Sequence, residues 1–509
     1  MESLTTQIAE LSPIPNNIAR IHYTFFQKNN LVPVGCRQEP TSLVVALPEG
    51  ESGAKSDILS IHANMPVEKM YVSREEFFNF LNVFREEQGK EVVIGVVEDL
   101  GESALSEIAQ EIPNGHDLLD YDANEPPIIK LVNLLFSIAA KDRASDIHIQ
   151  PYEKDLRVRF RIDGLLYDMY KPPKRAQEAI ISRIKVMAGL DVAEKRMPQD
   201  GRIKIRVNEK EIDIRVSIIP SAYGEQVVMR LLDKGAAMVG LDNIGMNPPL
   251  KKLMVSLITR PQGVFLVTGP TGSGKTTTLY AALQLINTPE KNILTVEDPV
   301  EYVIPGLGQL QVNPKIDLDF ARALRSFLRQ DPDVIMVGEV RDEETARIAI
   351  QAALTGHLVF STLHTNDSAS ALTRLIDMGI EPYLLTSSIT AVLAQRLLRR
   401  ICPYCREVYV PTEFERGLLR EYSKGGERTL YKGRGCENCI NTGYTGRVGI
   451  FELLVVSNKI RQMVQDKMSS EEIKAEAAKE GMTTLREDGM DKVFEGMTTL
   501  SEVVRVTIE

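Results

Sequence analysis

The sequence contains no tryptophan, and aromatic residues make up only 6% of its 509 residues. Proteins that track single-stranded nucleic acid stack its bases on aromatic side chains, so this scarcity argues against that class. The chain also lacks any run of 18 or more apolar residues, and its first residues lack a basic stretch followed by an apolar one. We therefore expect no transmembrane segment, no secretory leader and a cytoplasmic location, with attachment to a membrane through a partner left open.

An excess of positive charge is absent as well. The 60 Lys and Arg against 70 Asp and Glu give a net charge of −10, which argues against a protein that coats nucleic acid. The charge is unevenly distributed: residues 1–125 hold 8 basic and 21 acidic side chains (8 − 21 = −13), whereas residues 141–230 hold 19 and 14 (19 − 14 = +5). This contrast predicts separate domains with separate partners.

Cysteine is scarce, and its spacing is informative. Four of the five cysteines form two Cys-x-x-Cys units, Cys402 with Cys405 and Cys436 with Cys439, in a chain of cytosolic character. This pattern favours a metal over disulfides, and four thiolates predict a closed, structural Zn²⁺ site. The alternative, a redox pair, lacks a thioredoxin-like unit around either motif. The fifth cysteine, Cys36, is predicted to be a small buried hydrophobe.

A length of 509 residues predicts several domains. From the changes in composition and pattern we expect a small N-terminal domain at 1–99, an acidic linker at 100–127, an α+β domain at 128–235, an α/β core at 240–400, a tetracysteine zinc module at 401–445 and a C-terminal helical segment at 446–509.

The α/β assignment of the core depends on apolar runs that alternate with helix-forming sequence. The four candidate strands are Gly263–Thr268, Asn292–Val296, Val334–Val337 and Leu358–Ser361. Continuous apolar strands between helices indicate a parallel sheet covered on both faces.

The α+β domain instead shows strict alternation of apolar and polar residues, as in Leu156–Ile162, Ile203–Val207 and Ile212–Val216. A period of two is typical of strands with one buried face. The polar faces of these strands are rich in arginine. Two interpretations stay open: the arginines cover a solvated surface, or they face phosphate groups.

The strongest motif follows the first apolar strand of the core. It consists of Gly269, Pro270, Thr271, Gly272, Ser273, Gly274, Lys275 and Thr276, and it continues through Thr277 into a helical sequence. In this strand–loop–helix context, glycines let backbone N–H groups converge on a phosphate at the helix N-terminus. Lys275 would neutralise the β- and γ-phosphates, and the Thr276 hydroxyl would bind Mg²⁺. The motif predicts a P-loop NTPase that hydrolyses ATP.

Acidic and histidine side chains follow three other strands of the core, where doubly wound sheets bind ligands. Glu339 is our candidate for the carboxylate that activates water, and His364 is our candidate for the sensor of the γ-phosphate. Glu297 and Glu301 are further catalytic candidates, between which the sequence does not decide. Any one of these side chains could lie on the surface without a catalytic role, but their convergence on one P-loop favours catalysis.

These motifs occur in a recognisable order. The matching segments are Ala144–His148, Arg161–Gly164, Gln199–Arg202, Gly269–Thr276, Glu297–Glu301, Leu328–Asp333, Gly338–Asp342 and Thr355–Asn366. Over residues 125–509 the chain resembles the secretion ATPase family that powers type II secretion and type IV pilus assembly. In the family's terms these segments include an Asp box at Glu297–Glu301, a Walker B motif at Gly338–Asp342 and a His box at Thr355–Asn366.

The resemblance implies a RecA-like core preceded by a PAS-like N2 domain, in a homo-hexamer that holds ATP between these two domains. Arg202 and Arg215 of the N2 domain would then contact the nucleotide. Arg325 and Arg329, four residues apart and expected on one helix face, are candidate inter-subunit contacts, with a solvated helix face as the alternative. One departure concerns Glu339, which stands where P-loop enzymes usually carry an aspartate for Mg²⁺.

The resemblance also implies partners. Residues 1–99 would bind the cytoplasmic domain of an inner-membrane secretion-platform protein, and the zinc module would help dock the chain to that platform. The implied function is ATP hydrolysis that drives pseudopilus assembly and export through a type II secretion system. A type IV pilus extension ATPase is one alternative. A nucleic-acid translocase is another, of a different class, which charge and aromatic content disfavour.

Overall fold

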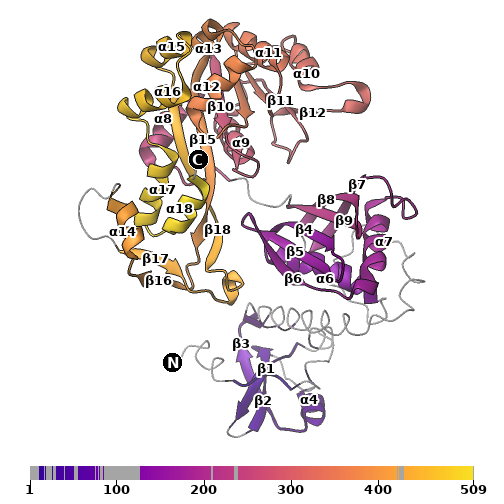
Figure 1. The fold of residues 1–509 in the computed structure, drawn as a ribbon. Helices are drawn as coiled ribbons and strands as arrows, with labels where there is room; N and C mark the ends of the chain where they lie inside the picture. The colour runs from indigo at the N-terminus through magenta and orange to yellow at the C-terminus, as the bar shows by residue number, and fades with distance from the viewer. Residues whose placement is uncertain are drawn as a thin grey trace. The chain divides into compact units, whose positions relative to one another are not determined.

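The computed structural model describes separate stretches between residues 11 and 84, and then residues 127–207, 210–233, 239–420, 422 and 429–507. These residues belong to two compact units, one formed by Met1–Arg161 with Leu166–Leu231 and the other by Ile162–Leu165 with Leu232–Glu509 (Figure 1). The expected linker at 100–127 lies outside the described residues, apart from Pro127. The finer division into domains therefore stays a prediction.

The described part of the N-terminal region contains a small mixed sheet. Strand β1 (Val32–Gln38) pairs antiparallel with β2 (Thr41–Pro48), which pairs in parallel with β3 (Val67–Val72). Helix α4 (Ser56–Ala63) connects β2 to β3. Cys36 is buried among the apolar side chains of this region, which confirms its prediction as a small buried hydrophobe.

The rest of the first unit is built on a six-stranded sheet in the order β6-β5-β4-β9-β8-β7. Its elements are α6 (Pro127–Lys141), β4 (Ala144–Pro151), β5 (Leu156–Ile162), β6 (Leu165–Tyr170), α7 (Gln177–Ala188), β7 (Gln199–Val207), β8 (Lys210–Ser221) and β9 (Gly224–Asp233). Buried and less buried residues alternate along β5, and the same holds for the end of β7. The predicted period of two is thus confirmed.

The second unit is built on a seven-stranded sheet in the order β12-β11-β13-β14-β10-β15-β18. Its strands are β10 (Gly263–Thr268), β11 (Ile293–Glu297), β12 (Gly308–Gln311), β13 (Val334–Val337), β14 (Leu358–Leu363), β15 (Ile389–Ile401) and β18 (Tyr444–Val455). All neighbours pair in parallel except β15 with β18. The expected parallel core is therefore correct, with one antiparallel strand added at its edge.

Helices cover both faces of this sheet (Figure 1). One apolar core lies under α8 (Pro248–Ile258) and α9 (Lys275–Ile286). The opposite core lies under α10 (Phe320–Phe327), α11 (Glu343–Leu354), α12 (Ser368–Asp377), α13 (Pro382–Ser388), α15 (Asn458–Gln465) and α16 (Ser470–Lys479). Because both faces are buried, the strands need continuous apolar runs, as the sequence indicated.

The expected helical segment at 446–509 needs one correction. Residues 446–455 belong to strand β18, which pairs with β15 over its whole length. This stretch is rich in Val, Ile, Leu and Phe, and such a buried run does not by itself distinguish strand from helix. The segment is helical from α15 onwards, and α16 begins with a capping box in which Ser469 and Glu472 cap each other's backbone N–H groups.

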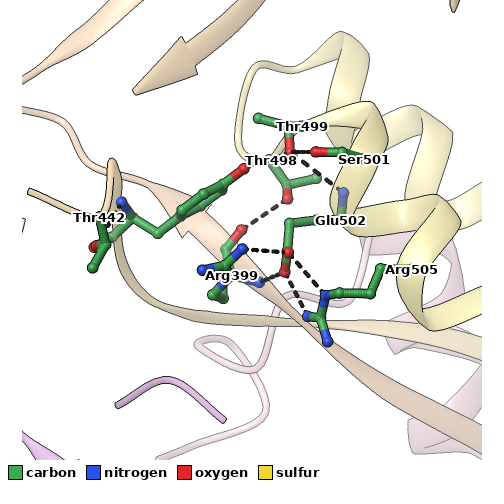
Figure 2. Close-up of polar contacts among 8 residues, drawn as sticks. Arg399, Thr442, Thr498, Thr499, Ser501, Glu502 and Arg505 are labelled. Carbon is green, nitrogen blue, oxygen red and sulfur yellow. Dashed lines mark hydrogen bonds and ion pairs between the residues drawn. The ribbon is translucent and has the colours of Figure 1, made fainter. Parts of the chain in front are cut away.

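The remaining elements lie at the C-terminal end of the second unit. They are β16 (Arg406–Tyr409), α14 (Glu413–Arg420), β17 (Leu430–Gly433), α17 (Leu485–Phe494) and α18 (Leu500–Thr507). A buried ion-pair network fastens α18 to β15, where Figure 2 shows the Glu502 carboxylate between Arg399 and Arg505. Nη2 atoms of both arginines donate to it at 2.7 Å, and the Arg399 guanidinium also lies 4.0 Å from the centre of the Tyr444 ring.

Burial raises the pKa of the Glu502 carboxyl, but the hydrogen bonds from Arg505 and Arg399 outweigh it and lower the pKa from 4.5 to about 2. A carboxyl whose pKa is lowered in the folded state stabilises it above the unfolded pKa. That stabilisation is lost as the pH falls from about 4.5 through about 2. The network should therefore hold α18 in place at neutral pH and release it in acid.

We expect Glu502→Gln to destabilise the docking of α18 by about 3 kcal/mol at pH 7, because it leaves Arg399 buried without its counter-charge. Native-state hydrogen exchange of the α18 amides measures this local opening. The mutant should also lose the decline in protection that the native protein shows below pH 4.5. Glu471→Gln, the same change at an exposed position of α16, should alter stability by less than about 0.5 kcal/mol. Equal effects of the two changes would contradict a stabilising network.

Candidate nucleotide-binding and hydrolysis site

The P-loop turns directly from β10 into α9. Gly272 and Gly274 have φ angles of 79° and 87°, a region in which side chains with a Cβ are strained. Lys275 begins the helix, and its Nζ atom donates to the carbonyl oxygens of Gly269 (2.7 Å) and Pro270 (3.2 Å). The Ser273 hydroxyl is buried without a hydrogen-bond partner. A folded-back lysine and an unsatisfied hydroxyl at a helix N-terminus fit a site made for a phosphate.

The electrostatics of the loop also favour an anion. Burial is the main reason why the pKa of Lys275 falls from 10.5 to about 8, while nearby Glu339 raises it and nearby Arg396 lowers it further. Lys275 therefore lies close to a second cation and to one carboxylate. A bound phosphate would restore the stability of the ammonium form, because it adds negative charge at short range.

The ends of β13 and β14 bring two predicted catalytic side chains together. His364 Nε2 lies 3.4 Å from Glu339 Oε2, and Arg341 pairs with the other oxygen of the same carboxylate. The Thr362 hydroxyl donates to the Gly338 carbonyl at 2.7 Å and fixes the two strand ends to each other. Glu339 is mostly buried and His364 is about half exposed. The geometry thus gathers Glu339 and His364 beside Lys275, although their catalytic roles remain predictions.

The loop that carries His364 is also bound to the P-loop strand. The backbone N–H of Thr365 donates to the Thr268 hydroxyl at 2.9 Å, and Thr268 is the last residue of β10. The adjacent register of β10 and β14 makes this contact possible, because Thr268 pairs with Leu363. His364 is therefore held at a defined position relative to the phosphate loop.

Glu297 occupies a different environment from Glu339. Its buried carboxylate accepts hydrogen bonds from the Thr295 hydroxyl (2.6 Å), the Gln309 amide (3.1 Å) and the Tyr280 hydroxyl. The Tyr280 oxygen in turn accepts from the backbone N–H of Glu301 at 3.4 Å. With both oxygens engaged, Glu297 joins the middle of α9 to the segment that follows β11. Whether Glu297 or Glu301 acts on the nucleotide remains a prediction.

In the first unit, Arg202 of β7 and Arg215 of β8 are direct cross-strand neighbours. Together with Asp146 and Arg230 they line a pocket of about 440 Å³. Asp146 accepts from Arg230 Nε at 2.9 Å, so part of the positive charge of this pocket is already neutralised. The arginine-rich face is thus a concave surface of this unit, and its contact with a nucleotide stays a prediction.

The two candidate inter-subunit arginines require a correction. Arg325 lies on α10 and pairs with Glu344, but the helix ends at Phe327, so Arg329 lies beyond it. Arg329 folds back and donates to the Arg325 carbonyl at 2.8 Å. The expected shared helix face is wrong because Gln330 to Asp333 turn the chain towards β13. Their role between subunits stays a prediction.

The four cysteines of the predicted metal site converge. Their sulfur atoms all lie within 4.8 Å of one another, with pairs at 3.7 Å (Cys436–Cys439), 3.8 Å (Cys402–Cys436) and 3.9 Å (Cys405–Cys439). Four thiolates at about 2.3 Å from one tetrahedral zinc ion have their sulfurs about 3.8 Å apart. The spacing therefore fits a Cys₄ metal site.

The surroundings of Cys439 also suit a thiolate ligand. Burial raises its pKa, but backbone N–H groups of Cys436 and Gly443 point at the sulfur and lower the pKa to about 7. Such N–H···S contacts stabilise the charged form of the sulfur. The site thus has both the ligand spacing and a supporting second shell.

Sequence reasoning missed two residues that complete the P-loop. Gln395 and Arg396 of β15 lie against it, and the buried Gln395 side chain accepts from the Thr278 hydroxyl of α9 at 2.7 Å. Their signal was available as two polar residues inside the apolar run of residues 391–398. The sequence does not show what these two residues contact, because only the sheet order makes β15 the neighbour of β10.

Comparison with known proteins identifies the family. Residues 122–505 match the family model described as "Type II/IV secretion system protein". A crystal structure of the pilus retraction motor PilT with bound ADP is 26% identical, with a TM-score of 0.50, over 74% of this chain and 96% of that one.

The sequence relatives are more similar. The type II secretion system protein E of Pseudomonas aeruginosa is 51% identical over 436 residues, which cover 86% of each chain. The type II secretion system ATPase E of Vibrio cholerae is 50% identical over 416 residues, which cover 81% of this chain and 82% of the relative. With a P-loop, two strand-end catalytic candidates and a tetracysteine cluster in one unit, the chain belongs to the family of type II secretion system ATPases.

Proposed function

We propose that this ATPase works as a homo-hexamer whose ATP hydrolysis drives pseudopilus assembly and protein export through a type II secretion system. The observation that carries the proposal is the meeting of Lys275, Glu339 and His364 at one edge of a parallel sheet. A phosphate-binding lysine and a carboxylate that can position water are groups that ATP hydrolysis uses, and the histidine beside the carboxylate could respond to the phosphate.

Each group has a distinct role in this proposal. Lys275 neutralises the β- and γ-phosphates, and Gly269–Thr277 provide the backbone N–H groups of the cradle. Glu339 orients the attacking water, and His364, whose Nε2 lies 3.4 Å from Glu339, responds to the γ-phosphate. Mg²⁺, held through the Thr276 hydroxyl, supplies positive charge to the phosphates when bound. Since Glu339 already interacts with His364 and Arg341, we assign it to water rather than to the metal.

Zinc has a structural role in this proposal. Cys402 and Cys405 follow β15, and Cys436 and Cys439 precede β18, so one ion joins the ends of two paired strands. Four thiolates leave no open position for a substrate, which excludes a catalytic site of the usual three-ligand type. The ion instead fixes the base of the segment between the two motifs.

The proposed location is cytoplasmic, with peripheral attachment to the inner membrane through partners. None of the helices in the described part of the chain is long and apolar enough to cross a membrane. Residues 1–99 would bind the cytoplasmic domain of a secretion-platform protein, consistent with the net negative charge of this region (8 − 14 = −6). The relatives named as type II secretion system proteins favour secretion over pilus extension.

We propose that Arg202 and Arg215 reach the nucleotide once the ring assembles. Substitution of Arg202 therefore tests the hexamer. We expect turnover per chain to rise with protein concentration as rings form. Arg202→Ala should lower the turnover of the assembled protein by about 10- to 100-fold, as the loss of a charged hydrogen bond predicts, and should leave the monomer's slow turnover unchanged. ATPase assays over a dilution series, with sedimentation to define assembly, measure both.

The matched control for this experiment is Arg206→Ala, an exposed arginine two residues from the end of the alternating segment of β7. It should leave the concentration dependence intact. Turnover that does not depend on concentration would contradict the hexamer. An equal loss in monomer and ring would contradict the interface role of Arg202.

A further inference from the structure

Strand β15 forms a side wall of the P-loop. It runs parallel to β10, and its Ala394 pairs with Thr268, the last residue before the loop. The next two residues of β15 therefore lie beside the first residues of the loop. A Cβ atom placed on Gly269 would lie 2.5 Å from the Gln395 carbonyl oxygen and 3.2 Å from Arg396 Nη1. The absence of a side chain at Gly269 lets β15 and its arginine approach this closely.

Gln395 and Arg396 point to opposite faces of the strand, as successive residues must. The buried Gln395 side chain accepts a hydrogen bond from the Thr278 hydroxyl and so holds α9 against β15. Arg396 is only partly buried and reaches the loop after β14, where its Nη2 donates to the carbonyl oxygen of Asn366 at 2.7 Å and to its side-chain oxygen at 3.3 Å. This loop also carries His364. One guanidinium thus bridges the P-loop and the His box.

The charge of Arg396 is not balanced by an ion pair. Among the described residues, no carboxylate oxygen lies within 4 Å of its guanidinium, and its hydrogen bonds go to neutral oxygens. Burial lowers the pKa of Arg396 and outweighs the charges of Asp367 and Glu452, which act on it from further away and raise the pKa. Its positive charge lowers the pKa of Lys275, although less than burial does. Two cations held near each other in a partly buried site gain stability when an anion binds between them. The planar guanidinium is suited to phosphate oxygens.

We propose that Arg396 is a phosphate-contacting residue of the ATP site that acts within its own chain and distinguishes ATP from ADP through the γ-phosphate. It lies beside Gly269, across the P-loop strand from β14, and its guanidinium reaches Asn366 in the loop that carries His364, so we place it at the terminal phosphate rather than at the base. Because Arg396 also donates to Asn366, binding of that phosphate would affect the loop that carries His364. This inference rests on the proposed hydrolysis site and adds a residue to it.

Arg396→Ala tests the proposal in the full-length chain. We expect the affinity for the nonhydrolysable ATP analogue AMP-PNP to fall by about 10- to 100-fold, the size of one charged hydrogen bond, while the affinity for ADP changes by less than about threefold. Turnover should fall with it. Arg396→Lys retains the positive charge but lacks the planar guanidinium that can donate two parallel hydrogen bonds. It should recover part of the preference for AMP-PNP over ADP. Isothermal calorimetry with each nucleotide and ATPase assays measure these effects.

Two further variants make the outcome interpretable. Arg400→Ala removes an exposed arginine from the same strand and should change neither affinity. Lys275→Ala should abolish binding of both nucleotides and turnover. Retained hydrolysis in Lys275→Ala would overturn the proposed site itself. If Lys275→Ala is inactive but Arg396→Ala loses ADP and AMP-PNP equally, or neither, then the hydrolysis site stands and the role of Arg396 as a γ-phosphate contact is refuted.

Discussion

Glu339→Gln should bind ATP and hydrolyse it about 10²- to 10⁴-fold more slowly than the native protein, the usual contribution of a positioned general base. Glutamine keeps the shape of the side chain but cannot accept a proton from water. Binding should be unchanged or tighter, because the substitution removes a negative charge close to Lys275, where the phosphates bind. Equilibrium titration with ATP and single-turnover kinetics separate the two effects.

The control for this substitution is Glu343→Gln, the same chemical change at an exposed residue in the first turn of α11. It should leave turnover near the native rate, since its ion pair with Arg347 is on the surface. A Glu339→Gln protein with near-native turnover would place the base elsewhere. A loss of ATP binding equal to the loss of turnover would show instead that Glu339 holds the nucleotide.

The second large effect concerns the metal. Cys405→Ser should weaken zinc binding by more than about 100-fold, because losing a first-shell thiolate costs more than the 10- to 100-fold typical of second-shell partners. The purified native chain should contain one zinc ion, and the mutant close to none. Without the ion, the ends of β15 and β18 lose their link, so hydrogen exchange should rise in β16 and β17. Elemental analysis and exchange mass spectrometry measure the two results.

Cys36→Ser is the internal control, since Cys36 is buried in the N-terminal sheet region and no other cysteine shares its core. It should leave the zinc content at one ion per chain. ATP binding should survive Cys405→Ser, because the P-loop lies beside the middle of β15, at Gln395 and Arg396, whereas the cysteines lie beyond its last residue, Ile401. Removal of the metal by a chelator that leaves folding, hydrogen exchange and partner binding unchanged would refute the structural role of zinc.

Much of the site could be predicted because its parts are local. The P-loop is a continuous run from Gly269, and each catalytic candidate follows a four- to six-residue apolar strand whose carboxyl end marks its place. Two strand ends in a parallel sheet meet at one edge whatever their sequence separation, which is why Glu339 and His364 could be expected to meet. The Cys-x-x-Cys pairs are local in the same sense.

Other features depended on pairing that no local pattern specifies. Residues 446–455 form β18 because β15 offers a long edge to an apolar run that is equally compatible with a helix. Arg329 leaves the expected helix face because α10 ends two residues earlier, after Phe327. The carboxylate of Glu297 accepts hydrogen bonds from Tyr280, Thr295 and Gln309, which come from three different segments.

The sequence by itself determined the phosphate loop, the strand-end residues and the four thiolates, because each is a short pattern whose chemistry requires a fixed spacing. Only the tertiary structure decided what surrounds them. The order β14-β10-β15 places the His-box loop on one side of the P-loop strand and Arg396 on the other, nearly 130 residues from Gly269 in the chain (396 − 269 = 127). Sheet order is set by the burial of both faces together, a property of the whole fold that no single segment contains.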